Sequence, residues 1–238
     1  MIPWSIPRMW EGGECWIIGG GPSMPLQFGV PEDVISAVLH KEHPLSSYSP
    51  FLSPIHNKHV IGVNAAFLLG EWIDITFFGD AGFYFANKAE MDVMTKLKVS
   101  CNPNLPKKDA RELVDIKYVP LNNRHPKGIS NRDNTVTWNL NSGAAAINLA
   151  YHLGVERVYL LGFDMAPSKE GIQHWHQHYR NGKDVMKPKD IKKLPFRRHL
   201  ECFPMVANDA RRLGLEIINV NPNSAIMAFK RVKLSDVL

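Results

Sequence analysis

Residues 142–164 read SGAAAINLAYHLGVERVYLLGFD and hold the clearest helix signal of the chain, followed at once by an apolar run. Asn141 or Ser142 can cap this helix, alanines fill it, and Gly154 can end it. The run at 155–161 has the length and apolar content of a buried strand. A helix that leads directly into a buried strand is typical of α/β proteins.

The same alternation extends to both sides of this stretch. Pro31 suits the first position of a helix, and Gly214 can end another. Strands separated by helices predict a doubly wound, mostly parallel, Rossmann-like sheet. Besides 142–153 and 155–161, we expect helices at 31–39, 91–98 and 205–213, and strands at 15–18, 60–63, 73–78, 116–119 and 215–220.

The bulk composition is that of a globular protein with one core. The chain has 238 residues, of which 45% are hydrophobic, and we expect a single α/β domain over residues 1–238. The three cysteines lie far apart without a CxxC pair, which argues against a disulfide framework or a cysteine zinc site. No apolar run reaches the roughly 18 to 20 residues that span a bilayer, and no signal-peptide pattern is present, so we expect a cytoplasmic protein. The net charge of +5 favours anionic partners such as nucleotides or nucleic acid.

Small and polar residues follow nearly every predicted strand. In a parallel sheet, ligands bind beyond the carboxyl ends of the strands. The start of the helix at 142 adds N–H groups that can hold a phosphate. We therefore predict a polar crevice that binds a nucleotide. Its residues would be Gly19, Gly20, Gly21, Pro22, Ser23, Asn64, Asp80, Ser142, Gly143, Asp164, Asn223 and Ser224.

The turn GGGPSM at 19–24 can bring backbone N–H groups close to a phosphate, because glycine has no Cβ. Met24 stands where a dinucleotide-binding fingerprint has its third glycine, and no GK[ST] follows, so neither an NAD loop nor a Walker loop is indicated. A plain turn between strand and loop is the alternative interpretation. Asp80 and Asp164 could likewise cap helices or hold loops.

His174, His176 and His178 alternate in the segment HWHQHYR. On a strand all three would share a face, and on a helix only His174 and His178 would. One of them, or His199, could act as a general base near neutral pH. A metal site is the second interpretation, with Asp164 or His199 as a further ligand, but the spacing matches no zinc motif and we assign no metal ligand. A solvated loop is the third.

Residues 180–198 carry eight basic and two acidic side chains, so their net charge of +6 exceeds the +5 of the whole chain. We expect a basic, lid-like insertion at about 173–198. Such a segment could close over phosphates or meet an anionic acceptor such as nucleic acid. A solvated loop is again the alternative.

Several motifs occur in an order known from one family. GGGPSM, IGVNAAF, NLNSGAAAINLAYHLGVERVYLLGFDM, a histidine pair and NVNPNSAIMAF follow one another between about Cys15 and Phe229. This order resembles the bacterial sialyltransferases of glycosyltransferase family 42. It also resembles related phage and bacterial proteins of the grouping that includes hydroxymethylpterin diphosphokinases. Gly20 and Ala166 stand where the sialyltransferases have an asparagine and a tyrosine.

The resemblance implies a nucleotide-sugar-dependent glycosyltransferase on an α/β scaffold with a lid. Its donor substrate would be of the CMP or UDP type, and it would require no metal or other cofactor. It implies that the second histidine of an HxxxH pair, His178 after His174, is the general base, with His199 as a rival. The partners would be the nucleotide sugar and a hydroxyl-bearing or anionic acceptor, nucleic acid included. A homo-oligomer is compatible with the sequence.

Two other functions remain open. The same scaffold could carry out pyrophosphoryl transfer, with Mg²⁺ held by Asp80 and Asp164. Alternatively, the chain could be a non-catalytic protein that binds a nucleotide or nucleic acid. The dependence of the reaction on a metal, and the salt dependence of DNA binding, distinguish these alternatives.

Overall fold

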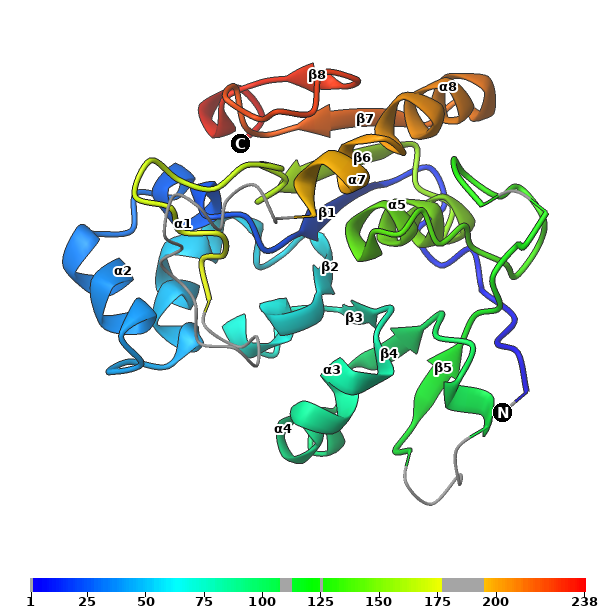
Figure 1. The fold of residues 1–238 in the computed structure, drawn as a ribbon, viewed down its shortest axis with the longest axis horizontal. Helices are drawn as coiled ribbons and strands as arrows, with labels where there is room; N and C mark the ends of the chain where they lie inside the picture. The colour runs from blue at the N-terminus through cyan, green and yellow to red at the C-terminus, as the bar shows by residue number, and fades with distance from the viewer. Residues whose placement is uncertain (1, 108–112, 125, 177–194) are drawn as a thin grey trace.

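The structure, a computed structural model, describes residues 2–107, 113–124, 126–176 and 195–238. Its centre is one eight-stranded sheet of order β5-β4-β3-β2-β1-β6-β7-β8, in which every neighbouring pair is parallel (Figure 1). The predicted doubly wound, parallel α/β fold is therefore confirmed. The strands are β1 (Glu14–Ile18), β2 (His59–Val63), β3 (Ile75–Phe78), β4 (Leu97–Ser100), β5 (Ile116–Tyr118), β6 (Arg157–Leu161), β7 (Glu216–Asn219) and β8 (Lys230–Arg231).

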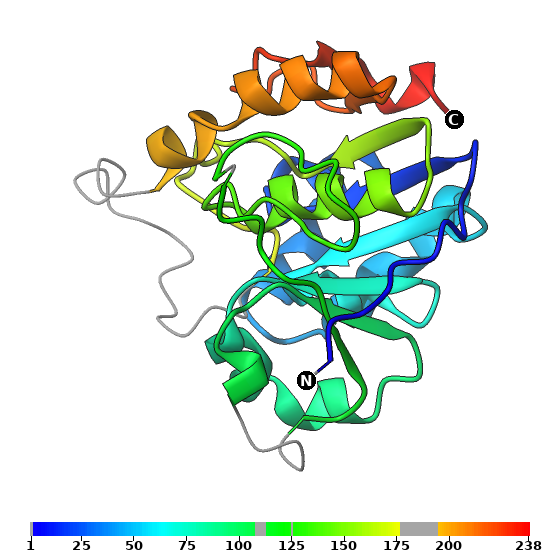
Figure 2. The same cartoon turned by 90° about the vertical axis from the view of Figure 1, so that its right-hand side faces the viewer.

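Helices cover both faces of the sheet, with α5 and α8 on one side and α1 and α2 on the other (Figures 1 and 2). The helices are α1 (Ser23–Gln27), α2 (Glu32–Leu39), α3 (Ala81–Ala86), α4 (Lys88–Asp92), α5 (Ser142–His152), α7 (Phe196–Leu200) and α8 (Phe203–Leu213). Short 3-10 helices are η1 (Leu45–Ile55), η2 (Asn64–Leu69), η3 (Leu105–Lys107) and η5 (Leu234–Asp236).

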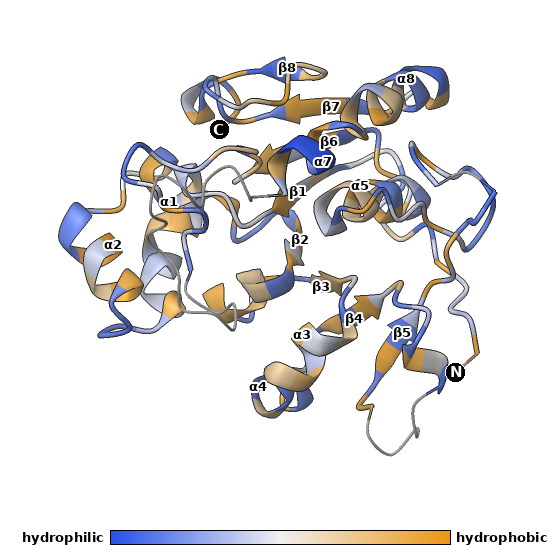
Figure 3. Ribbon diagram, in the orientation of Figure 1, coloured by the Kyte–Doolittle hydropathy of each residue, from blue (hydrophilic) through white to orange (hydrophobic). Residues whose placement is uncertain are grey.

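Alternate strand residues enter two separate cores. Ile17 packs in the core that includes α5 and α8, whereas its neighbours Trp16 and Ile18 pack in the core that includes α1, α2 and η1. Successive side chains of a strand point to opposite faces, and both faces here are covered by helices. The central strands are therefore apolar along most of their length, and they are orange in Figure 3.

The helix predicted at 142–153 forms as α5, Ser142–His152. Asn141 caps α5, since its Oδ1 accepts a hydrogen bond from the amide of Ala144 at 3.1 Å. Beyond the helix, Gly154 has a φ of 94°, in the left-handed region that favours glycine. Gly143 lets α5 approach the sheet, because a Cβ there would lie 2.7 Å from the ring of Phe163.

The prediction of a helix at 91–98 is wrong. Helix α4 ends at Asp92, and Leu97–Ser100 is strand β4. Lys98 lies in the middle of that strand and is buried, with its ammonium donating to the carbonyl oxygen of Met91 at 3.0 Å. The lysine thereby satisfies a backbone acceptor near the end of α4, and its charge hides the apolar pattern of a strand.

Candidate functional site

The strand order places a crevice between β1 and β6. The chain lays down β1 to β5 in one direction across the sheet and then returns to the other side of β1 with β6. Parallel sheets bind ligands at such a switch point, beyond the carboxyl ends of the strands. The glycine turn follows β1 at this point, and Gly162 follows β6. The amides of Gly19 and Gly21 donate to the carbonyl oxygens of Leu161 and Gly162, both at 2.8 Å.

A cavity of about 550 Å³ opens at this edge of the sheet. Its walls come from the ends of β1, β2, β3 and β6, the start of α5, and α7. The predicted site residues that line it are Gly19, Gly20, Gly21, Asn64, Asp80, Ser142, Gly143, His174 and His199. Five predicted nucleotide contacts do not line it, namely Pro22, Ser23, Asp164, Asn223 and Ser224.

Asp164 lies behind the glycine turn, where its carboxylate accepts hydrogen bonds from Ser23 Oγ at 3.0 Å and Asn221 Nδ2 at 3.1 Å. A Cβ at Gly21 would lie 1.9 Å from Oδ2 of Asp164, so only glycine fits between them. Burial raises the pKa of Asp164 to about 6, against the lowering effect of the Ser23 and Asn221 hydrogen bonds. Asp164 thus links the start of α1 to the turn at 221–224.

The turn at 221–224 is fastened to the same place. Ser224 is buried, and its Oγ donates to the carbonyl oxygen of Phe163 at 2.6 Å while accepting from Asn219 Nδ2 at 2.9 Å. The amide of Ala225 donates to the carbonyl oxygen of Asp164 at 2.9 Å. These bonds support the end of β6 from behind the cavity.

The segment that holds the alternating histidines packs onto the glycine turn. The amide of Trp175 donates to the Gly20 carbonyl oxygen at 3.1 Å, and Nδ1 of His174 lies 3.3 Å from the same oxygen. The rings of His174 and His176 stack with centroids 5.2 Å apart, as residues two apart do on extended backbone. Residues 174–176 are not helical, and His178 lies outside the described residues.

Two histidines with lowered pKa values line the cavity. Burial lowers the pKa of His174 to about 4, so its imidazole is neutral at pH 7. Burial also lowers the pKa of His199, and the neighbouring Arg198 guanidinium adds to that effect. A Cβ at Gly20 would lie 2.9 Å from Nδ1 of His174, so the imidazole occupies the space that a larger residue at position 20 would need.

Helix α7 brings Phe196, Arg198 and His199 to the cavity. It is hydrophilic along most of its length in Figure 3, and both arginines are exposed. Of the basic insertion predicted at about 173–198, only 173–176 and 195–198 are described, and the remainder lies outside the described residues.

The opposite wall comes from the ends of β2 and β3. Asp80 caps α3, with its Oδ1 accepting from the amide of Gly82 at 2.8 Å, and it is exposed at the rim. Asn64 begins η2 with a φ of 52°. The ring of Trp138 lies against Gly79, where a Cβ would come within 2.0 Å of it.

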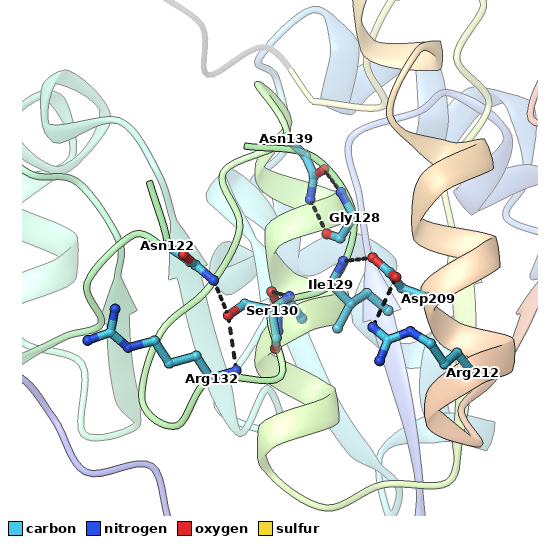
Figure 4. Close-up of polar contacts among 9 residues, drawn as sticks. Asn122, Gly128, Ile129, Ser130, Arg132, Asn139, Asp209 and Arg212 are labelled. Atoms are coloured by element: carbon cyan, nitrogen blue, oxygen red, sulfur yellow. Dashed lines mark hydrogen bonds and ion pairs between the residues drawn. The ribbon is translucent and has the colours of Figure 1, made fainter. Parts of the chain in front are cut away.

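A buried polar network, which no sequence motif above predicted, holds the segment 128–139 that leads into α5. Figure 4 shows Asn139 bonded to Gly128, and Asp209 of α8 accepting from the amide of Ile129 at 2.9 Å. Within α5, Asn148 accepts from the amides of Ser130 at 2.8 Å and Thr137 at 2.9 Å. The signal that could have indicated this network is Asn148 itself, an amide among apolar residues of a buried helix.

Within residues 2–107, 113–124, 126–176 and 195–238, no three His, Cys, Asp or Glu side chains form a group that could hold a metal ion. No helix there is long and apolar enough to cross a membrane.

Comparison with known proteins yields structural neighbours only. No family model and no curated protein matches the chain. The sialyltransferase CstII from Campylobacter jejuni in complex with the substrate analogue cytidine-5'-monophosphate is 14% identical, with 92% of this chain and 84% of that chain covered and a TM-score of 0.50. The same enzyme in complex with CMP-3FNeuAc is 14% identical, with 92% and 86% covered and a TM-score of 0.52. The chain therefore shares the α/β fold of a sialyltransferase.

Proposed function

We propose that this chain is a nucleotide-sugar-dependent glycosyltransferase. The observation that carries the proposal is the cavity at the switch point of the sheet, where the glycine turn, the N-terminus of α5 and the α7 residues Arg198 and His199 converge. The two neighbouring structures described above contain CMP or CMP-3FNeuAc, which supports a nucleotide-sugar donor of the CMP type, with UDP as the alternative to test.

The donor nucleotide would lie across Gly19–21, Asn64 and Ser142. Amides of the first turn of α5 have no acceptor within the helix and carry partial positive charge, which suits a phosphate. Asp80, exposed at the rim, would accept hydrogen bonds from ribose or base. Arg198 would balance the charge on the nucleotide phosphate as it leaves.

A histidine would remove the proton from the acceptor hydroxyl as the hydroxyl oxygen attacks the sugar carbon. The carbon–phosphate oxygen bond breaks in the same step, and the proton stays on the imidazole. A general base is most effective when its pKa is near the working pH, so His174, with a pKa of about 4, is the weaker of the two described candidates. His199 is the stronger. His178, the residue implied by the resemblance, is tested with them.

The proposed reaction needs no metal, because the α5 amides and Arg198 supply the positive charge. A chelator should therefore leave transfer unchanged. Loss of activity with EDTA, and its return with Mg²⁺, would instead support pyrophosphoryl transfer.

The first experiment is a thermal-shift screen of CMP, UDP, GDP and ADP compounds, with and without Mg²⁺. A nucleotide at 100 times its dissociation constant should stabilise the fold by about 2.7 kcal/mol. Transfer from the matching nucleotide sugar is then assayed in His174→Ala, His178→Ala and His199→Ala. The base variant should lose turnover by at least about 100-fold and keep nucleotide affinity. Binding of no nucleotide, or turnover of no nucleotide sugar, would contradict the proposal.

A further inference from the structure

Leu140 lines the cavity on a backbone conformation that leucine rarely adopts. Its φ is 53°, and the φ of Asn139 before it is 57°. The amide of Asn141 donates to the carbonyl oxygen of Trp138 at 3.1 Å and closes a four-residue turn. Positive φ at both central positions is the pattern of a type I′ turn, which strongly prefers the pair Asn-Gly. Leu140 therefore occupies the position that glycine suits best.

The surroundings impose this conformation. The buried side chain of Asn139 pairs with both backbone groups of Gly128, accepting from its amide at 2.8 Å and donating to its carbonyl oxygen at 2.9 Å (Figure 4). The Leu140 side chain, in contrast, is 47% exposed. An exposed leucine on left-handed backbone contributes less to stability than glycine would. Residues in such strained conformations cluster at active sites and ligand-binding sites.

A second apolar residue of the cavity has the same conformation. Met165 has a φ of 51° and lines the cavity, with its sulfur 4.0 Å from the side-chain amide nitrogen of Asn141. Trp138 and Phe196 line the same cavity. Trp138, Leu140, Met165 and Phe196 form what we term the apolar wall.

We propose that the apolar wall binds the acceptor, and that the acceptor is a glycoside with an apolar aglycone. This inference rests on the transferase function proposed above. The donor phosphate needs amides and cations, which the start of α5 and Arg198 supply. The exposed side chain of Leu140 is accessible from solvent, from which the acceptor enters. An aryl or alkyl aglycone packed against Leu140 would bury the leucine side chain away from water. The sugar hydroxyl would then lie in the cavity that His199 lines.

The test uses matched pairs of phenyl and methyl glycosides of galactose, glucose, mannose and N-acetylglucosamine. Their binding is measured by calorimetry in the presence of saturating nucleotide. At least one phenyl glycoside should bind roughly tenfold more tightly than its methyl partner. Leu140→Gly and Leu140→Ala should both abolish that preference. The melting temperature should rise in Leu140→Gly only, because alanine keeps the left-handed strain.

Lys41→Gly is the matched control. Lys41 also has a positive φ, 63°, but it is an exposed residue that follows α2 and does not line the cavity. Its replacement should raise the melting temperature and leave the phenyl preference unchanged. The inference is overturned if the parent shows no phenyl preference, if the preference survives in both Leu140 variants, or if Leu140→Gly melts well below the parent. Calorimetry measures glycoside binding and does not depend on turnover. A failure of the proposed transferase function would appear separately, as the absence of transfer in the activity assay.

Discussion

The indole nitrogen of Trp175 donates a hydrogen bond of 2.7 Å to the carbonyl oxygen of Gly19, although the two residues are 156 positions apart. Trp175 is buried, and its amide bonds to the next carbonyl of the same turn. The histidine-rich segment thus holds the glycine turn in place through its tryptophan. Because Gly19 lines the cavity, this contact links the segment to the candidate nucleotide site.

Trp175→Phe should therefore weaken both the fold and nucleotide binding. The phenylalanine ring keeps part of the packing but leaves the Gly19 carbonyl oxygen without this donor. We expect a loss of about 1–3 kcal/mol in the free energy of unfolding, measured by urea denaturation, and a weaker nucleotide titration. Trp72→Phe is the control, because the Trp72 indole donates to Ser49 Oγ at 2.8 Å and does not line the cavity. Unchanged nucleotide affinity in Trp175→Phe would show that the contact does not position the turn.

Gly20→Ala should displace the imidazole of His174. A methyl group at position 20 would lie 2.9 Å from Nδ1 of that ring. We expect Gly20→Ala to lower the free energy of unfolding by about 1–2 kcal/mol when His174 is present. The loss should be smaller when His174 has been replaced by alanine. Thermal unfolding of the two single variants, the double variant and the parent gives the coupling energy. Strict additivity would mean that the two side chains do not compete for this space.

The free energy of unfolding should fall in acid because of His174. The folded pKa, about 4, lies below the ordinary value of 6.5, so the unfolded chain binds the proton first. The contribution of the neutral His174 ring to the free energy of unfolding is fully present above pH 6.5 and is lost as the pH falls toward 4. We expect a loss on the order of 2 kcal/mol, discounted because the ring is partly accessible.

The measurement compares the parent with His174→Gln at several pH values, so that the contributions of other groups, Asp164 included, cancel. The contribution of Asp164 to the free energy of unfolding changes with pH in the opposite direction, because its raised pKa favours the protonated form in the folded state. A difference between parent and variant that stays constant from pH 7 to pH 4 would contradict the assignment to His174.

Asn148→Leu should cause one of the larger losses of stability. Two buried amides, those of Ser130 and Thr137, donate to Asn148, and the Asn148 amide donates to the Ser130 carbonyl oxygen at 3.0 Å. Leucine has a similar size but leaves these groups unsatisfied, which we expect to cost about 3 kcal/mol in chemical unfolding. The exposed Asn208→Ala should change stability by less than about 0.5 kcal/mol. Equal effects of the two substitutions would mean that the Asn148 network contributes little to the free energy of unfolding.

Local sequence patterns were sufficient for most of the fold. The caps and glycine that bound α5 act within a few residues of it, and apolar runs are enough to predict strands that are buried on both faces. Strand β4 was missed because Lys98 carries a charge into the core, where its ammonium finds carbonyl oxygens of the α4 end. Only contacts between elements make that burial tolerable.

For the candidate site, the sequence by itself determined that small and polar residues follow the strands, because parallel strands end at one edge of a sheet. The tertiary structure decided which of them line the cavity. Asn64, Asp80 and Ser142 do, whereas Asp164 and Ser224 hold loops behind it. Ser23 and Asn221, which donate to Asp164, and Phe163, which accepts from Ser224, each lie more than 50 positions from their partner in the chain. Spacing along a chain cannot reveal which side of a turn a side chain faces, because packing between distant segments sets that direction.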